Sequence, residues 1–565
     1  MSAVDGEHDR GVRVAFDVAA RMRDGVTLRA DVYRPAAAGR WPTLLTRTPY
    51  DKRRPRASAT IDPVAAARAG FLVVVQDVRG RFASAGAWEP LRHEREDGFD
   101  AVEWAARLPG SNGRVGMYGG SYCGSTQWQA SLARPPSLRA IAPLLTWCDP
   151  LDGLVARGGA RELGLNAWWG LETHLAQLAR PPLPSAARQR RRVAAVLDEI
   201  DRLATDGVRE LPVEGLGPLR RHGARDLGAT RRDAEPEVEV RGRVAGAHRQ
   251  VAVPVLNVGG WHDLFLQGTL DNHVATIATG GRSRLVVGPW GHGDCDLGAT
   301  VGDLSFGVRG NGLGTPAHPE GDLDDLQLAW FRRHLDPAAR TGDDDRPPVR
   351  IFTTGRNAWR DEPAWPLPRA RVRRWFLAPG GGLAPTPPTG PAAASGFVHD
   401  PADPVATVGG AIMIGGGYRR GPLDQARVEA RDDVLVFSSA PLTGELEVTG
   451  RVRVVLHAES SAPTTDWVAR LCDVHPDGRS YGVCDGVVRL LAGADRLRSV
   501  GIDLWSASHA FLRGHRLRLQ VASSSFPRWD RNLGAGDGPR GVAARQLVHH
   551  DGERRSWVEL PVVDG

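Results

Sequence analysis

Two kinds of hydrophobic pattern divide the chain. Up to about residue 345, short continuous apolar runs such as 71–75 alternate with stretches of helical spacing, and strands covered on both faces need such runs. Beyond residue 346, apolar residues alternate with polar ones, as at 452–456 and 517–521, which is typical of half-buried antiparallel strands. The pattern predicts a doubly wound α/β domain followed by an all-β domain of the sandwich or jelly-roll type.

The α/β part begins with a predicted hairpin and continues as alternating strands and helices. Asp24 and Gly25 form a turn signal between two runs of strand-forming residues. The hairpin strands are expected at 12–20 and 28–33, further strands at 41–46, 71–75, 115–118, 251–258 and 284–287, and helices at 63–69, 97–107 and 325–334.

A segment with a different residue pattern interrupts this alternation of strands and helices at 147–248. Val193, Val196 and Ile200 fall at helical spacing, and Trp168 adjoins Trp169. We interpret this segment as an inserted helical cap. The expected divisions are the first part of the α/β domain at 1–146, the cap at 147–248, the second part at 249–345 and the β domain at 346–565, with a linker at 343–348.

Length and composition are those of a soluble globular chain. At 565 residues it exceeds one hydrophobic core, and 41% hydrophobic with 24% charged residues is ordinary. The net charge is only +6 and arginines are spread along the chain, so we expect no nucleic-acid partner. We recognise no signal peptide and no apolar stretch of membrane length, so no membrane partner is expected. The five cysteines form no CxxC pair, which favours reduced thiols in the cytoplasm, and a homodimer stays open.

A glycine-rich strand-to-helix turn carries the first candidate for chemistry. Residues 113–128 read GRVGMYGGSYCGSTQW, which is a short strand, two glycines, Ser121 and a segment able to start a helix. A nucleophile elbow has this layout, because its strained turn lifts the serine hydroxyl from the strand end. The second glycine of Gly-x-Ser-x-Gly comes one place late, with Cys123 in its position, so an ordinary glycine-rich βα turn is the competing interpretation.

Two further candidates follow predicted strands at the same sheet edge. Asp263 comes after the strand at 251–258 and His292 after the strand at 284–287. Ligands of a doubly wound sheet bind beyond the carboxyl ends of its strands, and the order Ser, Asp, His is that of α/β-hydrolases. His292 would accept the proton of Ser121, and Asp263 would orient the imidazole.

Each of these residues also has a structural interpretation. Asp263 could cap the helix that follows it, and Asp294 could take its catalytic place. His292 could be a turn residue, with His262 or His273 as rivals. We favour His292, because His262 adjoins Asp263 on a strand end and His273 lies inside a helix.

The oxyanion of an acyl-transfer intermediate needs two hydrogen-bond donors. The backbone N–H of Tyr122 is one by the geometry of an elbow. Tyr50 ends an earlier strand and its phenol could be the second, although a Pro-Tyr pair in a turn is more often a packing element.

Several short motifs resemble those of the cocaine esterase-like (CocE/NonD) hydrolases, which belong with the X-Pro dipeptidyl-peptidases. In the first part they are RTPYDK at 47–52, QDVRGR at 76–81, GGSYCG at 119–124, GWHD at 260–263 and GPWGH at 288–292. RDDVLVF at 431–437, DVHPDGRS at 473–480 and SSSFPRWDRN at 523–532 resemble the family's jelly-roll domain. Gly-x-Ser-Tyr-x-Gly is the family's own form of the elbow.

The resemblance implies an α/β-hydrolase fold with a helical cap and a C-terminal jelly roll. It implies a triad of Ser121, Asp263 and His292, with Tyr50 and the Tyr122 amide as oxyanion donors. The reaction would be acyl transfer to the serine and hydrolysis by water, with no metal or organic cofactor.

The resemblance also bears on the substrate. The family's α-amino acid ester hydrolases place two acidic residues just after the catalytic Asp, whereas LFL at 264–266 follows Asp263 here. An apolar wall would favour an aromatic or aliphatic acyl group. The candidate wall residues, each of which could instead be packing in the cap, are Trp147, Trp168, Trp169 and Phe265.

Three functions follow from the sequence. The leading one is a serine hydrolase of carboxylic esters, extending to amides, that acts on a small ester or short peptide through Ser121. The first alternative is a dipeptidyl-peptidase that cleaves after proline. A carbohydrate-binding or scaffold role of the jelly roll is the third.

Overall fold

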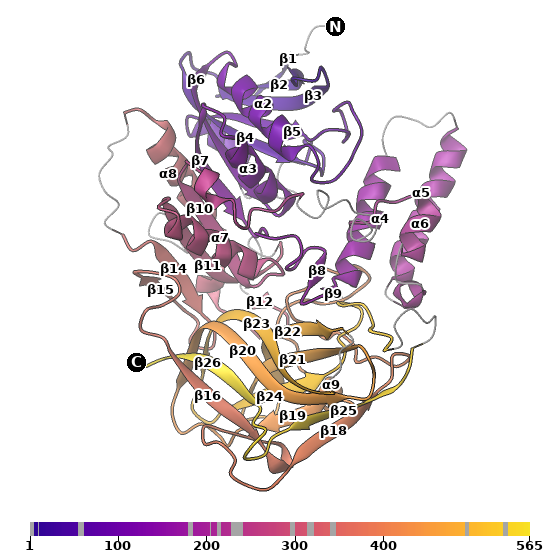
Figure 1. Ribbon diagram of the computed structural model, residues 1–565. Helices are drawn as coiled ribbons and strands as arrows, with labels where there is room; N and C mark the ends of the chain where they lie inside the picture. The colour runs from indigo at the N-terminus through magenta and orange to yellow at the C-terminus, as the bar shows by residue number, and fades with distance from the viewer. Residues whose placement is uncertain are drawn as a thin grey trace.

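A computed structural model of the chain describes residues 5–9, 11–54, 61–178, 185–203, 205–211, 216–227, 241–293, 300–313, 321–338, 346–491, 496–534 and 541–564. Asp294 and positions 343–345 of the expected linker lie outside these residues. Figure 1 shows the α/β domain at the top, a group of helices at its side, and the β domain below in orange and yellow. Among the described residues, no helix combines the length and the apolar character that crossing a membrane requires.

One eleven-stranded sheet forms the centre of the α/β domain. Its strands from β5 to β14 run parallel, and antiparallel strands flank them at both edges. In sheet order the strands are β1 (Asp5–Asp9), β2 (Val12–Arg21), β3 (Thr27–Pro35), β5 (Leu72–Asp77), β4 (Trp41–Thr48), β6 (Ser111–Gly120), β7 (Leu138–Leu144), β10 (Val255–His262), β11 (Ser283–Gly291), β14 (Val349–Thr353) and β15 (Ala358–Glu362). The predicted hairpin and the predicted strands of this domain are all present.

Helices cover both faces of the sheet, because neighbouring strand residues point to opposite sides. Leu44 and Val73 pack on the side of α1 and α8, whereas Leu45 and Val74 pack on the side of α2 and α3. The helices of this domain are α1 (Pro63–Arg68), α2 (Glu94–Ala106), α3 (Tyr122–Ala133), α7 (Leu266–Ala278) and α8 (Leu323–Leu335). This is the doubly wound arrangement that the sequence predicts.

Strands β14 and β15 correct the expected division of the chain. The boundary at 345/346 assigns them to the all-β part, but β14 pairs in parallel with β11 and thereby extends the first sheet. The sequence pattern could not reveal this pairing, because an edge strand shows the same short alternation of apolar and polar residues in either sheet.

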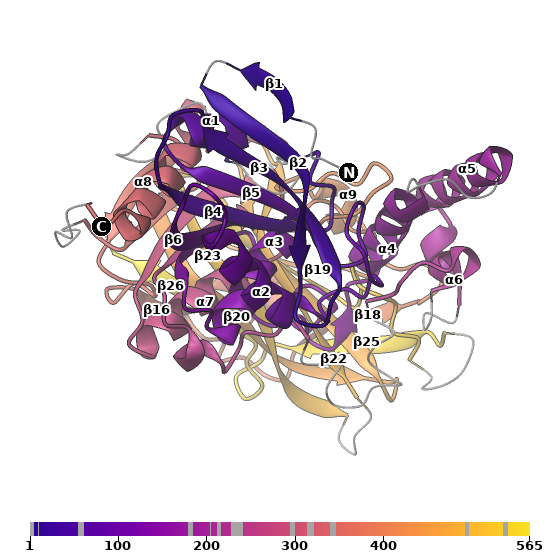
Figure 2. The ribbon, with the colours of Figure 1, turned by 90° about the horizontal axis from the view of Figure 1, so that it is seen from above.

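The inserted segment is helical, as predicted. It contains β8 (Ala156–Arg157), β9 (Ala160–Arg161), α4 (Leu163–Leu178), α5 (Ala186–Arg202) and α6 (Gly217–His222). Seen from above in Figure 2, α4, α5 and α6 extend to one side of the sheet. Arg81 ties α4 to the α/β domain, because its buried guanidinium donates to the Pro49 carbonyl at 2.8 Å and to the Thr173 carbonyl at 2.9 Å.

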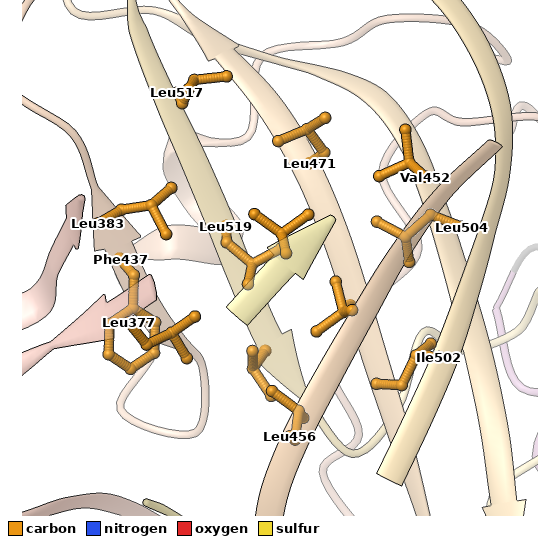
Figure 3. Packing of buried hydrophobic residues seen from close by; sticks show 14 of the residues in the cluster. Leu377, Leu383, Phe437, Val452, Leu456, Leu471, Ile502, Leu504, Leu517 and Leu519 are labelled. Atoms are coloured by element: carbon orange, nitrogen blue, oxygen red, sulfur yellow. The ribbon is translucent and has the colours of Figure 1, made fainter. Parts of the chain in front are cut away.

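The β domain packs its strands around one apolar core. The core side chains alternate along each strand with outward-facing ones, and Figure 3 shows ten of them labelled between the facing strands. The strands are β16 (Arg371–Ala378), β17 (Gly382–Ala384), β18 (Ala394–His399), β19 (Leu435–Ser438), β20 (Leu446–Ser460), β21 (Thr465–Val474), β22 (Ser480–Leu490), β23 (Leu497–Phe511), β24 (Arg516–Ala522), β25 (Ala544–His549) and β26 (Trp557–Val563). The short elements are β12 (Thr300–Val301), β13 (Leu304–Ser305) and α9 (Ala426–Glu429).

Candidate active site

Ser121 occupies a strained turn between β6 and α3. Its φ is 56° and its ψ is −124°, a conformation that non-glycine residues rarely adopt and that concentrates at functional sites. The Ser121 N–H donates to the Leu144 carbonyl at 2.9 Å, and Thr146 Oγ1 donates to the Ser121 carbonyl at 2.9 Å. A Cβ on Gly124 would lie 2.8 Å from Thr146 Cβ, which explains the glycine there. This geometry is that of a nucleophile elbow.

Cys123 takes the place where the common elbow motif has a glycine. Its side chain is buried, and burial raises the pKa of the thiol to about 12. The thiol therefore stays protonated at neutral pH and is a poor nucleophile. The Ser121 hydroxyl is the candidate nucleophile of this turn.

Neighbouring parallel strands bring Asp263 and His292 together. In the pairing of β10 with β11, His262 lies opposite Gly291. Asp263 follows His262 and His292 follows Gly291, so these two residues come at the neighbouring ends of the two strands. His292 Nδ1 lies 2.7 Å from Asp263 Oδ1, and Asp263 Oδ2 accepts a hydrogen bond from the Phe265 N–H at 3.1 Å. The carboxylate is fully buried. A buried carboxylate at Nδ1 fixes the orientation and tautomer of an imidazole.

Phe265 connects this pair to the elbow. Its ring meets the His292 imidazole edge-on, with the ring centroids 5.2 Å apart. The same side chain lines the cavity that contains Ser121. Ser121, Asp263 and His292 therefore each follow the carboxyl end of a parallel strand at one edge of the sheet, and Phe265 contacts His292 and lines the Ser121 cavity.

The rival histidines lie elsewhere. His262 stacks on Phe306 with the ring centroids 5.6 Å apart and lines a separate cavity beside the β domain. His273 Nδ1 lies 2.8 Å from Ser283 Oγ, at the first residue of β11 and thus at the opposite end of that strand from His292. His292, by contrast, pairs with the buried Asp263 carboxylate and contacts Phe265.

Tyr50 faces the elbow with its hydroxyl. The hydroxyl accepts a hydrogen bond from Trp169 Nε1 at 3.3 Å, and the side chain lines the same cavity as Ser121. Burial raises the pKa of Tyr50 well above its usual range, while hydrogen bonds with Trp169 and Ser121 act in the opposite direction. The phenol therefore stays protonated at neutral pH and can donate a hydrogen bond.

A buried polar chain holds the side chain of Tyr122. The Tyr122 hydroxyl donates to Glu94 Oε1 at 2.8 Å and accepts from the Leu91 N–H at 2.9 Å. Arg47 Nη1 in turn donates to Glu94 Oε2 at 2.7 Å. Sequence reasoning missed Arg47 and Glu94 in this role. Arg47 opens the RTPYDK motif, which was a usable signal, but nothing in the sequence joins it to the first residue of α2.

The cavity beside Ser121 is small and almost entirely apolar. Its volume is about 20 Å³, room for about one water molecule, so a bound acyl group requires the lining side chains to move apart. Trp169, Trp88 and Tyr122 form an aromatic group at its edge, with ring centroids 5.7 to 6.5 Å apart. The lining residues are Tyr50, Leu91, Ser121, Tyr122, Trp147, Leu154, Leu165, Trp169, Leu227, Phe265 and Met413.

Three of the four expected wall residues line this cavity, and Trp168 does not. Trp168 borders a different hollow, together with Ile414 and Tyr418. The cause is helix geometry, since consecutive residues of α4 point about 100° apart and Trp169 already faces Ser121. Trp168 packs against the same apolar cluster as Trp169 without lining this cavity, so its place in the wall stays a prediction.

Fold and site together define the class of protein. A mostly parallel sheet covered on both faces carries a serine on a strained turn after one strand and a hydrogen-bonded Asp–His pair after two later ones. These features, in this order along the chain, are those of an α/β-hydrolase, here with an inserted helical cap and a C-terminal β domain.

Comparison with known proteins identifies the family. Residues 24–294 match the family described as X-Pro dipeptidyl-peptidase (S15 family), and residues 341–559 match the X-Pro dipeptidyl-peptidase C-terminal non-catalytic domain. The chain is 34% identical to "Cocaine esterase" of Rhodococcus sp. (strain MB1 Bresler), across 99% of this chain and 100% of that protein. The chain therefore belongs to the cocaine esterase-like (CocE/NonD) serine hydrolases of the S15 family.

Two solved structures share the whole architecture. An α-amino acid ester hydrolase is 25% identical with a TM-score of 0.77, and the match covers 100% of this chain and 98% of that one. An aminopeptidase from the marine sediment archaeon Thaumarchaeota archaeon is 24% identical with a TM-score of 0.76 and 97% of each chain covered. At this level of identity, the similarity to the aminopeptidase shows a shared fold.

Proposed function

We propose that the protein hydrolyses carboxylic esters with an apolar acyl group through an acyl-enzyme on Ser121. Three observations support this most directly: the buried Asp263–His292 hydrogen bond, the strained turn at Ser121, and the apolar cavity that Ser121 lines. A serine hydroxyl is a poor nucleophile unless an adjacent base removes its proton.

The proposed reaction runs in two halves. His292 accepts the proton of Ser121 Oγ as that oxygen attacks the ester carbonyl, and it then passes the proton to the leaving alcohol. Water attacks the acyl-enzyme by the same route, which releases the acid and restores the serine. The Tyr50 hydroxyl and the Tyr122 N–H stabilise the negative oxygen of each tetrahedral intermediate.

The cavity lining supports the proposed acyl preference. Among the described residues, its lining contains no acidic side chain, and the three residues after Asp263 are Leu264, Phe265 and Leu266. An ammonium group would lose its hydration there without gaining a partner. Each methylene buried in such a pocket contributes about 0.8 kcal/mol, so kcat/KM should rise roughly fourfold per methylene until the cavity is filled.

One observation favours the dipeptidyl-peptidase as a second candidate. Glu172 lies one turn beyond Trp169 on α4, and its charge raises the pKa of Tyr50, after the larger effect of burial. A carboxylate within electrostatic reach of the site could pair with the N-terminal ammonium of a peptide. Comparable turnover of an Ala-Pro anilide and of aryl esters, with the anilide activity lost in Glu172→Gln, would support this candidate.

The decisive experiment labels the nucleophile and compares substrates. A fluorophosphonate probe should label the wild-type chain and the Ser121→Ala variant should lose the label, while Ser125→Ala, a buried serine on the same helix, should keep it. Aryl esters of increasing acyl length should outperform the Ala-Pro anilide. Labelling that persists in Ser121→Ala refutes the proposed nucleophile.

We also propose the cytoplasm as the site of action. Cys123, Cys148, Cys472 and Cys484, the cysteines that the structure describes, are free thiols. Free thiols suit a reducing compartment. Titration of the native and the unfolded chain with a thiol reagent would test this, because cytoplasmic protein should yield no disulfide-linked cysteine.

A further inference from the structure

Three imidazoles of the β domain converge on one buried carboxylate. Asp473, near the end of β21, is 2% exposed. His515 Nδ1, from the turn between β23 and β24, lies 2.9 Å from Asp473 Oδ1. His475 Nε2, from the turn after β21, lies 3.5 Å from Asp473 Oδ2. The ring centroids of His475 and His515 are 4.5 Å apart. One ligand atom from each of the three residues lies within 4.8 Å of the others.

We propose that Asp473, His475 and His515 bind a divalent transition-metal ion, for which zinc is the best fit. Two imidazole nitrogens and one carboxylate oxygen are ligands that zinc uses. Metal–ligand bonds of about 2.0 Å in a tetrahedron place the ligand atoms roughly 3.3 Å apart. Asp473 Oδ2 lies 3.1 Å from His515 Nδ1 and 3.5 Å from His475 Nε2, on either side of that value.

The third histidine, His509, stands where an outer partner of the carboxylate belongs. His509 Nε2 lies 3.1 Å from Asp473 Oδ2, and its Nδ1 lies 2.8 Å from Thr354 Oγ1. Partners of this kind orient a ligating carboxylate and tune its affinity for the ion. His509 thus positions Asp473 without contributing a ligand atom of its own.

The cluster opens into a cavity at the junction of the two domains. The cavity has a volume of about 160 Å³ and is lined by Asp473, His475, His509 and His515 from the β domain and by His262 from β10. His262 is buried, and its Nε2 has no hydrogen-bond partner among the described residues. With three protein ligands, the ion keeps one coordination position for a water molecule from this cavity.

The position of the cluster gives the ion a bracing role. Thr354, just beyond β14, donates its N–H to the Ser508 carbonyl at 3.0 Å and accepts from the Ala510 N–H at 2.9 Å. The α/β sheet is thereby joined to β23, the strand that also carries His509. An ion held by two turns of the β domain beside this junction would stabilise the folded protein, because the unfolded chain does not hold the three ligands together.

Metal content and affinity test the proposal on the full-length chain. After chelator treatment, protein loaded with zinc and desalted should hold about one zinc per chain, and zinc should raise the thermal unfolding midpoint. His475→Gln and His515→Gln should bind zinc at least tenfold more weakly. His457→Gln, a substitution in β20 of the same domain and outside the cavity lining, should bind like the wild type. Cobalt(II) in place of zinc should give a visible absorption band that the two ligand variants lack.

Two results overturn the proposal. One is a wild-type chain that retains no stoichiometric zinc, which would leave the cluster a histidine–carboxylate hydrogen-bond network. The other is equal zinc binding by wild type, His475→Gln and His515→Gln, which would place the ion elsewhere. The His475 side chain is partly exposed on a turn, so its substitution should leave the fold intact, as circular dichroism can verify.

Discussion

The Tyr122 hydroxyl donates a 2.8 Å hydrogen bond to Glu94, which lies at the start of α2. The phenol therefore belongs to the buried chain that continues to Arg47, while the backbone N–H of the same residue is the proposed oxyanion donor. Tyr50 presents the opposite case, since its hydroxyl reaches the Ser121 cavity. The two tyrosines proposed for the oxyanion site thus act through different groups, and substitution by phenylalanine separates them.

The Tyr122→Phe variant should lose stability but keep most of its activity. Removal of the hydroxyl leaves the Leu91 N–H and Glu94 Oε1 without this partner, which should lower the free energy of unfolding by about 1–3 kcal/mol. The backbone donor remains. Urea unfolding and ester kinetics measure both effects, and a loss of kcat as large as that from a missing oxyanion donor would contradict a purely structural role of the phenol.

The Tyr50→Phe variant should keep its fold and lose turnover. Loss of one oxyanion donor lowers kcat by about 10²–10³-fold, with KM for the same ester nearly unchanged. Tyr33→Phe is the matched control, because Tyr33 lies on β3 and packs near α1, away from the cavity. A Tyr50→Phe variant with normal kcat would contradict the proposed oxyanion role of this hydroxyl.

Asp263→Asn should abolish efficient turnover while the site stays folded. The amide offers Nδ1 of His292 the wrong hydrogen-bond pattern and removes the charge that stabilises the imidazolium, so kcat should fall by about 10⁴-fold. Asp271→Asn on α7 is the control, because that carboxylate accepts a hydrogen bond from Gln267 and lies outside the cavity. A loss below tenfold in Asp263→Asn would assign the orienting role to another residue.

The sequence predicted what depends on local pattern and chain order. The apolar runs located the central strands. Because parallel strands end at one sheet edge, the sequence also predicted Ser121, Asp263 and His292 at that edge, and their action as a triad stays a prediction. The helical spacing of apolar residues in the cap likewise predicted its helices. Motif resemblance added the proposed oxyanion roles of Tyr50 and the Tyr122 amide, which stay predictions.

The features that escaped prediction depend on distant partners. The assignment of β14 to the first sheet depends on its pairing with β11, which no local pattern reveals. The contact of Arg47 with Glu94 joins residues from different elements. Which residues of α4 line the cavity depends on the rotation of the helix about its axis, which packing of the whole cap decides.

His273 should make the protein sensitive to acid. Burial lowers its pKa from 6.5 to about 4, so the folded state keeps the ring neutral while the unfolded chain takes up a proton below pH 6.5. The unfolded state then binds more protons, and stability falls as the pH drops from 6.5 to about 4, by about 3 kcal/mol from this residue alone. In His273→Gln the fall between pH 7 and pH 4 should be smaller by that amount, as urea unfolding at both pH values would show. The free energy of unfolding at pH 7 corrects for any stability lost with the His273–Ser283 contact. If His273→Gln leaves the pH dependence of that free energy unchanged, the buried ring is protonated in the folded protein.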